Sequence, residues 1–290
     1  MTLLSSARKK FIDSLKTKGR ADATIIAYSK DIEQLVDHLE RNNILNAHEI
    51  SKGDIDNFLK HLSDANYTKK TISRKINAIK TFFKFLSDEK ITEIDPAQYV
   101  QHPKLEQNAP RILSKIEYRA LRDTVKDDVR TKAIVEILLQ TGVRISELAA
   151  MKMAHVHIAE SDAQSYLEIP GTRNTPGRTI PLNKAVKESI EAFLKERPNS
   201  KIDNVFVTKT GNPLLVRNIR ATLGRYFKQI ALENVTVNDL RHTFVAEHLR
   251  RGASVLLVSK VAGHKRLTTT ENYLKYIERK ESGIGELEEL

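Results

Sequence analysis

The chain of 290 residues has no cysteine, which excludes disulfides, thiolate zinc sites, iron–sulfur clusters and cysteine nucleophiles. It has no run approaching about 18 uncharged apolar residues, and its first ten residues lack the apolar stretch of a secretory signal. A P-loop, a dinucleotide-type glycine fingerprint and a His-Glu-x-x-His metal motif are also missing, so nucleotide-driven and zinc chemistry lose their usual sequence support. These absences favour a soluble cytoplasmic protein that acts without a membrane partner.

The composition is that of a globular protein with a surplus of positive charge. Hydrophobic residues make up 40% and charged residues 29%, and the length favours two domains. Forty-eight Lys and Arg residues against thirty-seven Asp and Glu residues give a formal net charge of +11. A surplus of this size indicates a polyanionic partner, and it favours nucleic acid over a basic protein with no such partner.

Glycine and proline are almost absent from the first ninety-five residues, where only Gly19 and Gly53 precede Pro96. The pattern predicts four helices, at 5–18, 22–43, 52–65 and 69–89. The last one carries an apolar stripe at helical spacing, made of Ile72, Ile76, Ile79, Phe83 and Leu86. A basic cluster accompanies it: Lys69, Lys70, Arg74 and Lys75. This cluster is either a DNA-facing surface or a solvated helix face, and the sequence leaves both open.

Residues 96–112 contain three prolines and show neither helical nor strand periodicity, so they are predicted to be an interdomain linker. Directly afterwards, Ser114 and Glu117 form a capping-box pattern that predicts a helix start. Residues 113–290 are mostly helical in pattern. Their one alternating segment, 165–169 and 178–182 around a turn at 174–177, predicts a β-hairpin.

Four short motifs carry residues suited to phosphate chemistry. Residues 141–148 place a glycine helix stop before Arg144, which opens a new helix with Glu147 one turn further on. Arg241 and His242 follow much later, then Gly263-His264, and Tyr273 nine residues after that histidine. Each motif alone is more simply explained as a surface ion pair, a helix cap or helix packing. All four motifs in this order, with the predicted hairpin between the first and the second, would rarely occur together by chance.

These motifs resemble those of the tyrosine recombinase (phage-integrase-like) family, and within it the compact Xer-type and transposon-borne members. The resemblance rests on Thr141 to Leu148, Leu240 to Phe244, Gly263-His264 and Thr269 to Tyr273. The spacing of twenty-three residues from Arg241 to His264 is similar to that of Xer-type members. The resemblance implies a mainly α fold: a SAM-like four-helix core-binding domain over 1–95, the linker, and an α+β catalytic domain over 113–290 with a small β-hairpin.

The resemblance also implies roles in strand exchange. Tyr273 would attack a backbone phosphodiester and form a 3′-phosphotyrosine, and Arg144 and Arg241 would hold the non-bridging oxygens without a metal or cofactor. An arginine so placed in phosphoryl transfer contributes on the order of 10³ to 10⁵ in rate. His264 would donate to the phosphate or handle the tyrosine proton. Tyr276 is the nearest competing tyrosine and is interpreted as a packing neighbour. Thr268 with Glu271 predicts a capping box that starts the helix of Tyr273.

Two positions depart from the family pattern. Asn238 stands three residues before Arg241, where the family usually has a histidine, and asparagine cannot exchange a proton. The hairpin lacks the family's lysine, since no lysine lies between Lys152 and Lys184. Its place falls near Arg173, with Arg178 as the other candidate. An arginine there is a poor general acid, although its charge still stabilises the leaving oxygen.

The expected partner is a double-stranded DNA recombination site, bound by a tetramer on two sites that passes through a Holliday junction. Arg217, Arg220 and Arg225 are candidate DNA contacts, or else an exposed basic face. The acidic tail, 282–290, is either a disordered end or a segment whose Leu287 and Leu290 dock on a neighbouring subunit, as C-terminal segments of the family do. Two alternatives stay open: a type IB topoisomerase-like DNA-relaxing enzyme and a non-catalytic DNA-binding relative.

Overall fold

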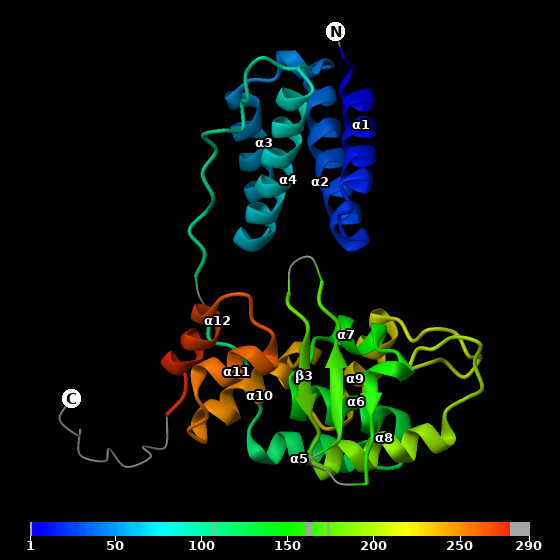
Figure 1. Cartoon of the computed structure of the whole chain (residues 1–290). Helices are drawn as coiled ribbons and strands as arrows, with labels where there is room; N and C mark the ends of the chain where they lie inside the picture. Colours follow the sequence, from blue (N-terminus) through cyan, green and yellow to red (C-terminus); the bar gives the residue numbers. More distant parts are fainter. Residues whose placement is uncertain (1, 107, 161–163, 173–174, 279–290) are drawn as a thin grey trace, which may run out of the picture. The chain divides into compact units, whose positions relative to one another are not determined.

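The computed structural model describes residues 2–106, 108–160, 164–172 and 175–278 (Figure 1). By its internal contacts the chain divides into two units, Met1–Gln107 and Asn108–Leu290. The boundary lies inside the predicted linker, yet parts of that segment pack into the units. Ala97 and Val100 are buried in the core of the first unit, and Ile112 packs against a buried cluster of the second.

The first unit is a bundle of four helices. They are α1 (Leu4–Thr17), α2 (Asp22–Arg41), α3 (Lys52–Asp64) and α4 (Lys69–Asp88), with the short turn η1 (Ala47–Glu49) between α2 and α3. All four lie within three residues of the predicted ranges. Ser51 and Thr68 cap the last two helices by accepting a hydrogen bond from a backbone N–H. The predicted apolar stripe of α4 is buried along its whole length, beside Phe11, whose ring meets that of Phe82 edge to face at 5.2 Å.

The second unit is mostly helical and contains one small sheet. Its helices are α5 (Lys115–Thr124), α6 (Val129–Thr141), α7 (Ile145–Ala150), α8 (Lys184–Glu196), α9 (Val216–Gln229), α10 (Val237–Arg250), α11 (Val255–Ala262) and α12 (Leu267–Glu271), with the 3₁₀ turns η2 (Met153–His155) and η4 (Asn272–Lys275). The predicted capping box of Ser114 and Glu117 is confirmed at the start of α5. Helix α6 is buried around its whole circumference between α8 and α10, so it forms the centre of this unit.

The predicted hairpin is confirmed as strands β2 (Tyr166–Ile169) and β3 (Arg178–Pro181), which pair antiparallel with Leu167 opposite Ile180. A two-residue strand, β1 (Val156–His157), adds to β2, giving the order β1-β2-β3. Leu167 and Ile180 face the core, whereas Glu168 and Thr179 between them are exposed. The sheet therefore covers the helical core on one face and carries Arg178 at the start of β3. Within the described part of the chain, no helix is long and apolar enough to cross a membrane.

Candidate active site

A glycine turn between α6 and α7 presents the first arginine. Gly142 has φ of 63°, and a Cβ there would lie 2.3 Å from a ring carbon of Phe244, so both the backbone and the space require glycine. The turn leaves Arg144 as the N-cap residue of α7. Its backbone N–H donates to Glu147 Oε2 at 2.8 Å, which satisfies an otherwise unpaired donor of the helix start. The predicted glycine stop and new helix are confirmed.

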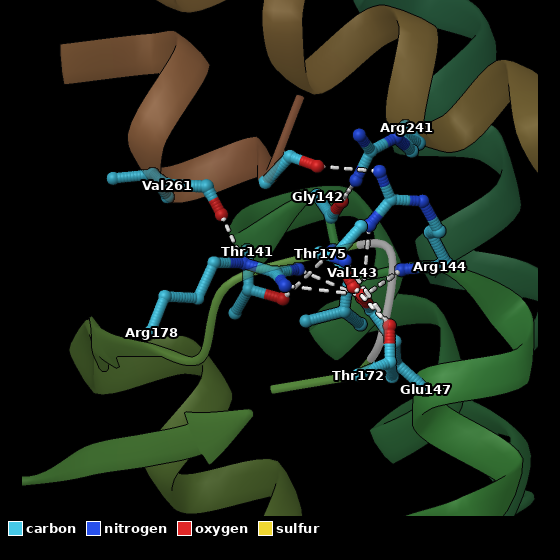
Figure 2. Close-up of polar contacts among 11 residues, drawn as sticks. Thr141, Gly142, Val143, Arg144, Glu147, Thr172, Thr175, Arg178, Arg241 and Val261 are labelled. Carbon is cyan, nitrogen blue, oxygen red and sulfur yellow. Dashed lines mark hydrogen bonds and ion pairs between the residues drawn. The ribbon is translucent and has the colours of Figure 1, made fainter. Parts of the chain in front are cut away.

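Glu147 joins two arginines (Figure 2). Arg144 Nη1 donates to Oε1 at 2.8 Å, while Arg178 reaches Oε1 at 3.0 Å and Oε2 at 2.7 Å as a bidentate fork. Burial by itself would raise the pKa of Glu147, but the hydrogen bonds and charges of the two arginines outweigh it and lower that pKa. The carboxylate is therefore ionised at neutral pH and holds both guanidinium groups.

The second arginine meets the first across the fold. Arg241 lies in α10, and its Nη1 donates to the carbonyl of Gly142, while Arg144 Nη2 donates to the carbonyl of Gly263 (Figure 2). Burial, followed by repulsion from the positive charge of Arg144, lowers the pKa of Arg241 to about 10. Arg241 still carries its charge at pH 7. Two positive groups, ninety-seven positions apart in the sequence, thus lie close together, and among the described residues an ion pair with a carboxylate is seen only for Arg144.

His264 follows the left-handed Gly263 (φ 67°), which ends α11. Its Nδ1 lies 2.7 Å from Thr270 Oγ1, and its ring stacks on that of Tyr273 with 6.4 Å between centroids. Burial first, and then the charges of Arg241 and Arg144, lower the pKa of His264 to about 4. The imidazole is therefore neutral at pH 7 beside two cations and is suited to donating a hydrogen bond rather than a charge.

Tyr273 lies in the 3₁₀ turn η4 and is 6% exposed. Its Oη is 2.5 Å from His242 Nδ1, and burial raises its pKa although Arg241 opposes that effect. The predicted capping box is wrong: α12 begins at Leu267 after Arg266, without a side-chain cap, and ends before the tyrosine. The box cannot form because Thr268 is the second residue inside α12 and Glu271 its last, so neither is at the position that a capping box requires.

The two departures from the family pattern are Asn238 and the hairpin position where the family has a lysine. Asn238 lies exposed in the first turn of α10, beside a surface hollow that Arg220 and Gly224 also line. Arg173 lies outside the described residues. Arg178 is bound on all sides: besides Glu147, it donates from Nε to the Val261 carbonyl at 2.7 Å, and its side chain is 8% exposed.

Of the predicted DNA-facing residues, six are exposed and one is buried. Lys69, Lys70 and Arg74 of α4 are exposed, as are Arg217, Arg220 and Arg225 of α9, whose opposite face is buried. Lys75 does not belong with them. It is 3% exposed, and its Nζ binds Asp31 Oδ1 at 2.8 Å. The prediction that Lys75 contacts DNA is wrong because this lysine neutralises a buried carboxylate of α2.

Two contacts of the site were not predicted from sequence. One joins His242 to the Tyr273 hydroxyl, and the other joins Arg178 to Glu147. The adjacency of His242 to Arg241 was the available signal for the first. Among the described residues, no group of three or more acidic, histidine or cysteine side chains is placed to hold a metal ion.

The comparisons with known proteins agree with this arrangement. Residues 105–279 match the phage integrase family model and residues 9–90 match its N-terminal SAM-like domain. Tyrosine recombinase XerC of Staphylococcus saprophyticus is 32% identical, with 88% of this chain and 87% of the relative covered. Tyrosine recombinase XerD of Oceanobacillus iheyensis is 30% identical, covering 88% of each. The crystal structure of a lambda integrase dimer bound to a COC′ core site superposes with a TM-score of 0.76 at 17% identity, covering 98% of this chain and 81% of that one.

The chain therefore belongs to the phage integrase family. It is an enzyme of the tyrosine recombinase class, which cleaves and rejoins DNA strands. The SAM-like helical unit and the mainly α catalytic unit expected from the sequence are both confirmed. These matches do not favour the topoisomerase-like or non-catalytic alternatives.

Proposed function

We propose that this protein is a site-specific DNA recombinase in which Tyr273 is the nucleophile, Arg144 and Arg241 hold the scissile phosphate, and His264 donates a hydrogen bond to it. The observation that supports this most strongly is the convergence of the four side chains from three separate parts of the sequence. Arg241 and Arg144 both act on the pKa of His264, whose ring stacks on that of Tyr273.

The charges fit the reaction. As Tyr273 Oη attacks, the phosphorus becomes five-coordinate and negative charge grows on its non-bridging oxygens. Two preorganised guanidinium groups stabilise that charge without reorganising. Arg178 contributes indirectly, since it shares Glu147 with Arg144. Asn238 can donate a hydrogen bond to a phosphate oxygen, and Arg173, which corresponds to the family lysine by its position in the sequence, would stabilise the leaving oxygen by its charge.

The test is covalent trapping on a nicked suicide duplex, in which the cut strand is lost and the adduct persists. Tyr273→Phe is expected to bind DNA but to form no adduct. The control, Tyr276→Phe, alters the tyrosine three residues along and keeps the adduct. A normal yield of adduct in Tyr273→Phe would move the nucleophile elsewhere.

The proposed assembly is a tetramer on two double-stranded DNA sites, passing through a Holliday junction. Exposed Lys69, Lys70 and Arg74 in the first unit and Arg217, Arg220 and Arg225 in the second would contact phosphates. The tail, through Leu287 and Leu290, would dock on a neighbouring subunit. Truncation after residue 278 is then expected to leave single-site binding intact but to abolish two-site complexes in a gel-shift assay; intact two-site complexes would exclude the tail.

A further inference from the structure

His242 contacts the reacting oxygen of the proposed nucleophile. Its Nδ1 is 2.5 Å from Tyr273 Oη, and the two ring centroids are 5.9 Å apart. In the part of the chain that the structure describes, this is the one side-chain hydrogen bond to that hydroxyl. Because the tyrosine is 6% exposed, bulk water has little access to its proton.

We propose that His242 is the base that accepts the Tyr273 proton during strand cleavage, an inference that rests on the proposed role of Tyr273. The Oη–P bond forms, the bond from phosphorus to the 5′ oxygen breaks, and the tyrosine proton passes to Nδ1. The leaving 5′ oxygen takes a proton from water. In religation the 5′ hydroxyl attacks phosphorus and gives its proton back to the solvent, the bond from phosphorus to the 5′ oxygen forms, the Oη–P bond breaks, and His242 returns its proton to Oη.

The other candidate bases are worse placed. His264 directs its Nδ1 to Thr270 and meets Tyr273 by ring stacking, not at the hydroxyl. Asn238 is exposed and its amide cannot accept a proton. Because Asn238 cannot accept a proton, another residue must do so, and His242, one turn further along α10, is positioned for this role.

The electrostatic surroundings suit this role. Burial lowers the pKa of His242, with Asp239 opposing and Arg241 adding to the effect, so the imidazole is neutral and able to accept at pH 7. The charged and titratable groups around it are Asp239 and Arg241 on its own helix, Tyr273 on η4, and His264 after α11. Burial raises the pKa of Tyr273, so its proton does not leave spontaneously at neutral pH.

The first experiment uses His242→Asn in the full chain, because asparagine keeps a polar atom near the Nδ1 position but cannot take a proton. The rate of adduct formation is measured in single turnover, with saturating protein on the suicide duplex, from pH 5 to pH 8.5. We expect a loss of about 10²-fold or more with unchanged DNA affinity. We also expect the wild-type rate to fall as the pH drops below about 6.5, through the lowered pKa of His242, and the variant to lose this dependence.

Matched controls separate this role from a structural one. His248→Asn makes the same change on the same helix at a half-buried histidine away from the site, and we expect a wild-type rate. A duplex with sulfur at the scissile 5′ position has a leaving group that needs no protonation. The His242→Asn defect should persist on it, since the nucleophile is what is impaired. Added imidazole should raise the rate of His242→Ala.

Three results would overturn the assignment: a His242→Asn rate within threefold of wild type, a defect that disappears on the 5′-sulfur duplex, or no response of folded His242→Ala to imidazole. Tyr273→Phe separates an error in the nucleophile, Tyr273, from an error in the base, His242. If it forms adduct, the nucleophile is misassigned. If it forms none while His242→Asn is normal, the error is confined to the base.

Discussion

Arg178→Met removes a bidentate ion pair from the centre of the site while keeping most of the side-chain volume. Arg178 is 8% and Glu147 14% exposed in their side chains, so the pair is largely desolvated. Removing one partner of a buried pair costs about 3–5 kcal/mol. Because Glu147 keeps Arg144, its charge is not left unpaired, and we expect a smaller loss of roughly 2–3 kcal/mol in the free energy of unfolding. In a domain of this size that lowers the unfolding temperature by roughly 4–12 °C.

The assay is thermal and urea unfolding of wild type, Arg178→Met, Glu147→Gln and the double variant. A double-mutant cycle should give a coupling energy of about 1–3 kcal/mol between the two positions. Arg178→Lys keeps the charge but loses the planar fork, so it should recover only part of the loss. On the suicide duplex, Arg178→Met should slow adduct formation more than it weakens binding, because Arg144 shares the same carboxylate.

The pH dependence has a definite sign. The folded-state pKa of Glu147 is lowered, so its ionisation stabilises the protein above its unfolded pKa of about 4.3, and this contribution disappears as the pH falls through the folded value. The difference between wild type and Arg178→Met should therefore shrink below about pH 4. Equal unfolding temperatures at pH 7, zero coupling, or a difference that stays constant down to pH 3.5 would refute the reasoning.

The remaining predictions concern separate parts of the molecule. Gly142→Ala should destabilise the second unit by about 2–4 kcal/mol in urea unfolding, since a Cβ meets the Phe244 ring and φ is positive; a loss below 1 kcal/mol would contradict this. His264→Gln should slow adduct formation by the same factor at pH 6 and pH 8, because the wild-type imidazole, with a pKa of about 4, is neutral at both; a factor that changes with pH would show that it titrates there. Arg220→Ala should reduce the salt dependence of DNA binding by about one unit of slope, whereas buried Lys75→Met should leave that slope unchanged; equal slopes for the two variants would remove Arg220 from the interface.

The sequence by itself determined the helices of the first unit, the hairpin and the identity of the motif residues. These features depend on local patterns: an apolar stripe at helical spacing in α4, a glycine stop at Gly142, and alternation on both sides of a turn. Such patterns depend on residues close together in the sequence, so they can be recognised without knowing the tertiary structure. The family motifs likewise selected Arg144, Arg241, His264 and Tyr273 before any contact between them was known.

Only the tertiary structure decided which charges are free and which groups touch the tyrosine. Lys75 and Arg74 are adjacent in the sequence and both bind Asp31, yet Lys75 is 3% exposed and Arg74 is exposed, because the two side chains leave α4 on different faces. His242 meets Tyr273 across thirty-one positions, and Arg178 meets Glu147 across the same separation. Burial and partner charge set these roles, and both depend on segments that adjoin only after the chain has folded.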